Sequence, residues 1–233
     1  MDIIINADDF GLSSGVNEGI IDTHLNGVVT RTTLLMNGHA VEEAVRLAKN
    51  HPSLKVGIHL TFTFGRPLNQ KATSELTNAD GKFKFSSIET PLSQLEIRQI
   101  KNEWQSQIEA FRQTGLELDH IDSHHHVHGW TDLKKVILEL GTLYHVPIRY
   151  TKTIKDHPEH TLTEYAWLNF YEDGVDHHLF EYLTDLPYPT VEVMTHPAVI
   201  DEKLKTVSSY VSYREIERQL LKTMVPTKNV NLI

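Results

Sequence analysis

The chain lacks cysteine throughout its 233 residues, which excludes disulfide bonds, thiolate metal ligands and cysteine nucleophiles. It also lacks any apolar run that approaches the roughly 20 residues needed to span a membrane. The N-terminal stretch MDIIINADDFG has neither the charged region, the long apolar region nor the cleavage site of a signal peptide. We therefore expect a cytoplasmic protein that makes no contact with a membrane.

Positive charge is scarce, with 22 Lys and Arg against 31 Asp and Glu and a net charge of −9. No basic stripe is present, so the electrostatic signature of a nucleic-acid-binding protein is missing. The motifs of serine hydrolases, P-loop enzymes and Rossmann enzymes are absent as well. No linker or low-complexity segment divides the chain, and we expect one domain, residues 1–233, with a single large core.

Short apolar runs alternate with helical patterns, which is typical of βα units and a largely parallel sheet. The expected strands lie at about 3–5, 28–36, 55–62, 116–122, 146–150, 190–195 and 231–233. The expected helices lie at about 14–25, 41–49, 92–114 and 212–223, with another after Thr131. Segments 66–87 and 151–175 are irregular, as lids and binding loops often are.

Four of these strands end in residues that can bind metals or transfer protons, namely Asp8-Asp9, His59, His124 and His196. In parallel α/β folds, the loops at the carboxyl ends of strands carry the functional site. We therefore expect these side chains to converge.

Each of these positions also has a structural interpretation. Adjacent carboxylates such as Asp8 and Asp9 repel unless a cation or proton lies between them; alternatively, one caps the next helix and the other is solvated. His59 stands among apolar neighbours, as many core histidines do. Pro197 restricts the backbone of His196 and so fixes the direction of its side chain; alternatively, the His-Pro pair has only the structural role of turning the chain. Arg149 could contact an acidic or hydroxyl-rich ligand, or form an ordinary ion pair.

Histidine is the residue type in excess, with 15 in the chain and four of them in HHHVH at 124–128. Imidazole is the commonest metal ligand, and an extended chain would place His120, Asp122 and His124 on one face. The remaining residues, with Asp122 foremost, could orient the ligands, because a ligating histidine usually donates its second N–H to a partner. The spacing leaves open which histidine binds.

One carboxylate and two imidazoles supply three ligands and leave positions open for water, as catalytic metal sites do. A cation so held polarises an amide carbonyl and lowers the pKa of water. A second carboxylate could take the proton from that water, and a histidine opposite could give one to the departing nitrogen. The residues therefore indicate a metal-dependent hydrolase.

Five stretches that sample nearly the whole chain resemble the YdjC-like family, whose characterised members include chitooligosaccharide deacetylases. They are INADDFGLSSGVNEGI, VTRTTLLMNG, VGIHLTFTFGRPL, HIDSHHHVH and EVMTHPAVID. The resemblance implies an α/β fold, an irregular (β/α) TIM-like barrel related to that of the polysaccharide deacetylases.

The resemblance also implies one divalent cation, held by Asp9, His59 and His124. Analogy with the related deacetylases makes Asp8 the base and His196 the acid. Two imidazoles favour Zn²⁺, whereas carboxylate and water ligands suit Mg²⁺. We expect His126, together with Asp122 and Arg149, to bind substrate or to support the ligands.

The implied substrate is a small chito-oligosaccharide, such as N,N′-diacetylchitobiose, chitotriose or their 6-phosphates, which loses one acetyl group. Two alternatives are a metal-dependent hydrolase of a phosphoester or glycosidic bond in a sugar phosphate, and a non-catalytic sugar-phosphate binding protein. Base rates for soluble proteins favour a homodimer.

Overall fold

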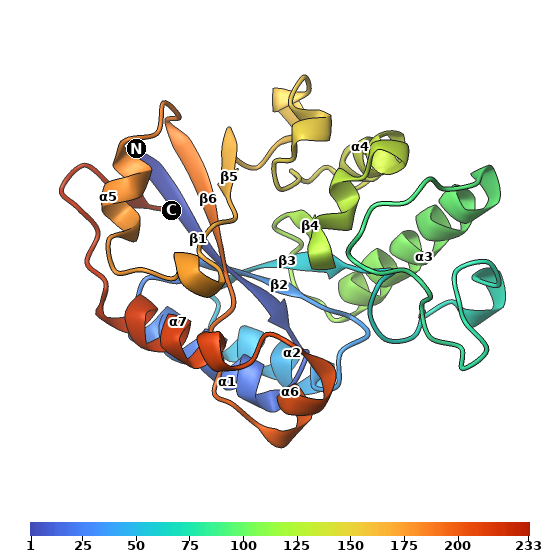
Figure 1. Ribbon diagram of the computed structural model, residues 1–233, viewed down its shortest axis with the longest axis horizontal. Helices are drawn as coiled ribbons and strands as arrows, with labels where there is room; N and C mark the ends of the chain where they lie inside the picture. Colours follow the sequence, from blue (N-terminus) through green and yellow to red (C-terminus); the bar gives the residue numbers. More distant parts are fainter.

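The computed structural model describes residues 1–233 and contains a strongly curled sheet of parallel strands (Figure 1). In spatial order the strands are β4 (Ile121–Ser123), β3 (Lys55–Leu60), β2 (Arg31–Leu34), β1 (Asp2–Phe10), β6 (Thr190–Thr195) and β5 (Tyr165–Trp167). A short last strand, β7 (Asn231–Leu232), pairs with β1 at Asp2 and Ile3. Since parallel neighbours need crossover connections, the chain returns over the outside of the sheet.

The helices that make these connections cover the convex side. They are α1 (Ser14–Leu25), α2 (Val41–Asn50), α3 (Gln94–Gln113), α4 (Lys134–Tyr144), α5 (Leu179–Thr184), α6 (Glu202–Val207) and α7 (Ser212–Thr223). Short 3₁₀ turns occupy Gln70–Ala72, His124–Gly129, Thr131–Leu133, Lys152–Ile154, Pro158–His160 and Glu172–Gly174. In Figure 1, α1, α2 and α7 lie together beside one part of the sheet, and α3 and α4 lie beside β3 and β4. None of the helices combines the length and hydrophobicity needed to cross a bilayer.

The strand β1 is buried on both faces, but the two faces differ in polarity. Ile3, Ile5 and Ala7 belong to the hydrophobic core under the helices. On the opposite face Asn6 donates hydrogen bonds to Asp8 and Thr33. Because alternate strand residues point to opposite faces, the concave face of β1 carries polar groups toward its carboxyl end.

The α/β class and the parallel sheet are confirmed, whereas a closed barrel is not observed. The strand expected at 146–150 contributes only isolated bridges, from Ile148 to Ile121 and to Thr161. Pro147 lies in the middle of this segment and has no N–H to donate to a ladder. The six strands therefore form a half-barrel, and irregular chain follows β4 where a barrel would need further strands.

The long helices were predicted better than the short strands. Helix α1 has the expected bounds, and the helix expected at 92–114 is α3, which starts at a capping box formed by Ser93 and Glu96. The strand expected at 28–36 is only the four-residue β2, and the one at 116–122 is the three-residue β4. Segment 151–175 was expected to be irregular throughout, but it contains β5, whose three residues are too few to show an alternation.

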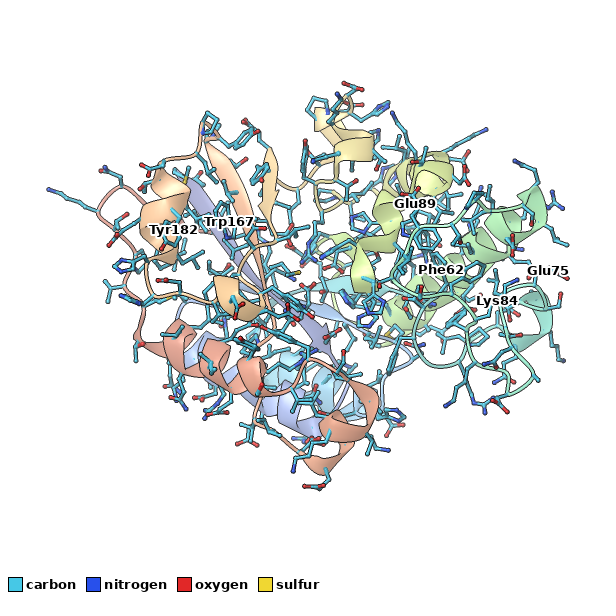
Figure 2. The ribbon with its side chains drawn as sticks, viewed as in Figure 1. Phe62, Glu75, Lys84, Glu89, Trp167 and Tyr182 are labelled. Carbon is cyan, nitrogen blue, oxygen red and sulfur yellow. The ribbon has the colours of Figure 1, made fainter.

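Segment 66–87 packs onto α3. In Figure 2, Phe62, which precedes this segment, lies near α3, and Glu75 lies at the outer edge of the molecule. The Phe62 ring lies 5.1–5.9 Å, centroid to centroid, from the rings of Phe85, Trp104 and Trp130. Only Ser87 of this segment lines the cavity described below.

Where β2 and β4 begin, Asp119 contacts both Arg31 and His120. The Arg31 Nε and His120 Nδ1 atoms each lie 2.9 Å from the Asp119 carboxylate. Burial alone would raise the pKa of Asp119, but His120 and Arg31 outweigh it and lower the pKa to about 2. Because the folded-state pKa is lowered, the stabilisation is complete above the ordinary carboxyl pKa and is lost as the pH falls through about 2.

We therefore expect Asp119→Asn to lower the free energy of unfolding by about 2 kcal/mol at pH 7 and by about half as much at pH 3. Urea unfolding followed by circular dichroism measures both values. Asp80→Asn, at an exposed turn position, is the matched control and should change neither. If Asp119→Asn lowered the free energy of unfolding by the same amount at pH 7 and at pH 3, the ion-pair account would be contradicted.

Candidate active site

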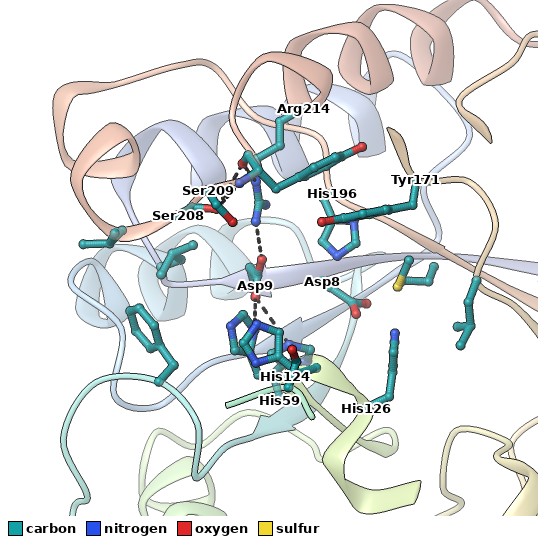
Figure 3. A pocket seen from close by; sticks show the side chains of 18 residues that line it. Asp8, Asp9, His59, His124, His126, Tyr171, His196, Ser208, Ser209 and Arg214 are labelled. Atoms are coloured by element: carbon teal, nitrogen blue, oxygen red, sulfur yellow. Dashed lines mark hydrogen bonds and ion pairs between the residues drawn. The ribbon is translucent and has the colours of Figure 1, made fainter. Parts of the chain in front are cut away.

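The carboxyl ends of β1, β3, β4 and β6 surround a cavity of about 510 Å³ (Figure 3). Six of the eight predicted site residues line it, namely Asp8, Asp9, His59, His124, His126 and His196. The other two, Asp122 and Arg149, are fully buried behind them. The four strand ends therefore converge, as parallel topology requires.

Both aspartates reach the cavity because β1 is irregular where they occur. The register between β1 and β2 shifts between Ala7 and Phe10, and Asp9 has a φ of +70°. Such a bulge re-aims a side chain that would otherwise point to the opposite face. The side chain that caps α1 is Ser13, and both aspartates are buried. The alternative of one capping and one solvated aspartate is therefore wrong.

Asp9, His59 and His124 form a trio whose ligand atoms all lie within 4.8 Å of one another. The Asp9 Oδ1 atom is 3.4 Å from His59 Nε2 and 3.0 Å from His124 Nδ1. One carboxylate and two imidazoles suit Zn²⁺ or another divalent cation. All three residues line the cavity, so a cation among them could also contact water or a ligand. The trio therefore fits a catalytic metal.

Other groups of carboxylates and imidazoles are poorer candidates. They are Asp8, His59 and Asp122; His120, Asp122 and Glu192; and Asp176, His177 and His178. In the first two groups a guanidinium already occupies the place between the carboxylates, because Arg149 Nη2 lies 2.6–2.8 Å from Asp8, Asp122 and Glu192. The third group is on the surface segment before α5 and does not line the cavity.

His59 is held by a carboxylate on the side away from the trio. Its Nδ1 lies 2.7 Å from Asp122 Oδ1, which leaves Nε2 directed at Asp9. Burial alone would lower the pKa of His59, but the carboxylates of Asp122, Asp9 and Asp8 outweigh it and raise the pKa to about 10. A cation that binds Nε2 must displace this proton.

Asp8 is held by a forked ion pair with Arg149, at 2.6 and 2.7 Å, and by Asn6 at 2.8 Å. Burial alone would raise the pKa of Asp8, but Arg149 outweighs it and holds the pKa well below its ordinary value. Asp8 is therefore ionised at neutral pH. Arg149 also donates to Glu192 at 2.8 Å and does not line the cavity. Of the two roles that the sequence left open for Arg149, the structure shows the ion pair.

His196 faces the trio from the end of β6. Its backbone N–H donates to Glu217 Oε2, and its Nδ1 lies 3.8 Å from Glu217 Oε1. Glu217 is itself fixed by Tyr210, whose hydroxyl donates to Oε1 at 2.6 Å. The backbone at His196 is thus fixed by a buried carboxylate, while the Nδ1 atom of its ring has no hydrogen-bond partner.

Arg214 holds Asp9 from the side opposite the histidines. Its Nη2 is 2.5 Å from Asp9 Oδ2, which leaves Oδ1 to face His59 and His124. Burial alone would raise the pKa of Asp9, but Arg214 and then His124 outweigh it and hold the pKa well below its ordinary value. Asp9 is therefore ionised, as a metal ligand must be.

The chain turns sharply after His124, where His125 and His126 both have left-handed backbone angles. Such angles are costly away from glycine and cluster at functional sites. The turn brings both rings to the cavity, with His125 Nδ1 3.1 Å from Thr63 and His126 Nδ1 without a partner. Burial and then Arg149 lower the pKa of His126 to about 3, so its ring is neutral.

His120 does not join this group, although alternation placed it beside Asp122 and His124. It is fully buried and packs on Gly57, where an added Cβ would come within 2.7 Å of the His120 ring. The alternation does place His120 beside Asp122, since their ligand atoms lie within 4.8 Å of each other, but His120 does not line the cavity.

The sequence patterns also missed Glu192, Arg214 and Glu217, all of which are buried. One signal was available in α7, where Arg214, Glu217 and Leu221 recur at the spacing of a single helix face. Charged residues on the face that also carries a core leucine require partners inside the protein.

A sequence model of the YdjC-like protein family matches residues 2–224. The chain belongs to the YdjC-like family. A carbohydrate deacetylase of Oceanobacillus iheyensis is 48% identical over 221 residues, covering 95% of this chain and 96% of that protein. A carbohydrate deacetylase of Halalkalibacterium halodurans is 38% identical over 238 residues and covers both chains fully.

A crystal structure from Enterococcus faecalis V583, described as a candidate cellobiose-phosphate cleavage protein, superposes with a TM-score of 0.87. It is 33% identical and covers 95% of this chain and 90% of that one. The similarity to these proteins extends over at least 95% of the chain, so membership in the YdjC-like family rests on more than a few short motifs. The names of the two carbohydrate deacetylases agree with the expectation of a hydrolase that cleaves amide bonds.

Proposed function

We propose that this YdjC-like protein is a metal-dependent carbohydrate deacetylase that acts on a small chito-oligosaccharide. The observation that carries the proposal is a trio of metal-binding side chains flanked by two further groups. Asp9, His59 and His124 share the cavity with an ionised carboxylate, Asp8, and a histidine, His196, neither of which belongs to the trio.

Asp9, His59 and His124 would hold the cation, which when bound polarises an amide carbonyl and lowers the pKa of water. Asp122 fixes the His59 ring and Arg214 fixes the Asp9 carboxylate. These buried contacts hold two of the three ligands in place before a cation arrives, which reduces the cost of binding it.

Asp8 accepts the proton of the attacking water, because Arg149 keeps it ionised. Water adds to the amide carbon, and the carbon–nitrogen bond then breaks as His196 gives a proton to the nitrogen. The products are acetate and an amino sugar. The Glu217 carboxylate lies 3.8 Å from the Nδ1 atom of His196.

The cavity suits a small sugar in size and lining. Its volume of about 510 Å³ lies within the range of small-molecule sites. Its apolar lining includes Leu168 and Met194, against which an acetyl methyl group could pack. The names of the relatives favour an acetylated carbohydrate, and that of the Enterococcus protein adds a sugar phosphate.

The test is a mass-spectrometric screen of N-acetylglucosamine, N,N′-diacetylchitobiose and chitotriose, each with and without a 6-phosphate. We expect loss of one acetyl group with Mg²⁺ or Zn²⁺, no reaction after chelation, and recovery when the cation is restored. Release of phosphate or a cleaved glycosidic bond without acetate would instead support the hydrolase of another bond. Binding without any turnover would support a binding protein.

A further inference from the structure

Tyr171 is an aromatic side chain at the cavity that the chemistry above does not use. It lines the cavity and is 37% exposed. Its ring stacks on Tyr210 at 4.2 Å between centroids and 16° between planes, and it meets the His196 ring edge-on at 5.7 Å. One face of Tyr171 is therefore covered by Tyr210, and Tyr171 is the exposed member of this pair at the cavity.

The segment that carries Tyr171 is fastened on both sides. The preceding Phe170 is fully buried in the core. After it, the backbone N–H of Glu172 donates to the Tyr210 hydroxyl at 3.2 Å, and Tyr213 donates to Asp173 at 2.7 Å. The ring is thus held in place before any ligand binds, which lowers the entropy cost of binding.

The local backbone is also specialised for this position. Glu172 has a φ of +50°, a left-handed angle that is costly for a residue with a side chain. Gly174 closes the turn so tightly that an added Cβ would lie 1.9 Å from the Asn169 carbonyl oxygen. Strain of this kind persists where surrounding contacts impose it, and here those contacts fix the Tyr171 ring.

The residues around Tyr171 indicate which kind of ligand its ring would bind. In Figure 3, Tyr171 lies beside His196 and on the same side of the cavity as Asp8. A flat apolar ring face suits the C–H face of a pyranose. The neighbouring carboxylates of Glu172 and Asp173 would repel a phosphate, so a neutral ring is favoured at this place.

We propose that Tyr171 is a stacking platform for a neutral pyranose ring of the substrate, beside His196. The proposal rests on the proposed function for the identity of the sugar. It makes Tyr171 a specificity residue that separates acetylated sugars from other acetamides, because an acyclic amide has no ring face to stack.

The experiment measures the affinity for N,N′-diacetylchitobiose by titration calorimetry, with metal-loaded protein in an Asp8→Asn background that does not turn over. Adding Tyr171→Ala should weaken binding about tenfold or more, whereas Tyr171→Phe, which keeps the ring, should stay within about twofold of the parent. The matched control is Tyr182→Ala, on the exposed face of α5 (Figure 2), which should have no effect.

Equal affinity of the parent and Tyr171→Ala, or no binding of the sugar by the parent, would overturn the platform. The platform would also be overturned if Tyr171→Ala, made in the enzyme with Asp8 intact, left KM unchanged and lowered kcat. Tyr171 would then act through Tyr210 and His196 and not by binding the sugar. A parent that binds the sugar, while the enzyme with Asp8 intact releases no acetate, would refute the proposed function and leave the platform standing.

Discussion

Asp8→Asn should lower kcat for deacetylation by about 10²–10⁴-fold, the usual contribution of a general base. The amide that replaces the carboxylate cannot accept the proton from water. The cation should still bind, because Asp8 is not part of the trio of Asp9, His59 and His124. Acetate release measured alongside metal content by mass spectrometry tests both statements.

Stability must be followed in the same experiment, because Arg149 loses its ionic partner at Asp8. An unpaired buried donor costs about 1–3 kcal/mol, which leaves a folded protein. Asp2→Asn, at the opposite end of β1, is the matched control and should keep the full rate. An Asp8→Asn enzyme that deacetylates at the native rate would remove Asp8 from the mechanism.

His124→Ala should abolish metal-dependent activity and weaken metal binding by more than about 100-fold, the upper limit for loss of a mere supporting residue. The reason is that the variant keeps one imidazole and one carboxylate, too few to hold a divalent cation tightly. Calorimetric titration with Zn²⁺ and acetate release measure the two effects.

His177→Ala is the matched control, because His177 belongs to the exposed group that also has metal-ligand spacing. It should leave both the metal stoichiometry and the rate unchanged. If His177→Ala lost the bound ion and His124→Ala kept it, the cation would lie on the surface, and the catalytic assignment would be wrong.

The sequence predicted the convergence of Asp8, Asp9, His59, His124 and His196 because each follows a strand of a parallel sheet. Strand order matters little for this inference, since the carboxyl ends of all parallel strands lie at one edge. For that reason, errors in the extent of β2 and β4 did not disturb it.

The open half-barrel and the burial of Glu192 could not be predicted in the same way. Whether 146–150 pairs as a strand depends on neighbours far along the chain, and one proline is enough to prevent a ladder. Glu192 lies between two valines of β6, and its partner Arg149 is 43 positions away. Local patterns carry no information about such pairs, and the bulge that turns Asp9 into the cavity depends equally on tertiary contacts.

The central claim is that Asp9, His59 and His124 hold one divalent cation at the mouth of the half-barrel. Its most direct test is anomalous diffraction at the zinc absorption edge from crystals grown with Zn²⁺. The account predicts one strong peak among these three side chains, absent in crystals of His124→Ala. A principal peak at Asp176, His177 and His178, or no peak at the strand ends, would contradict it.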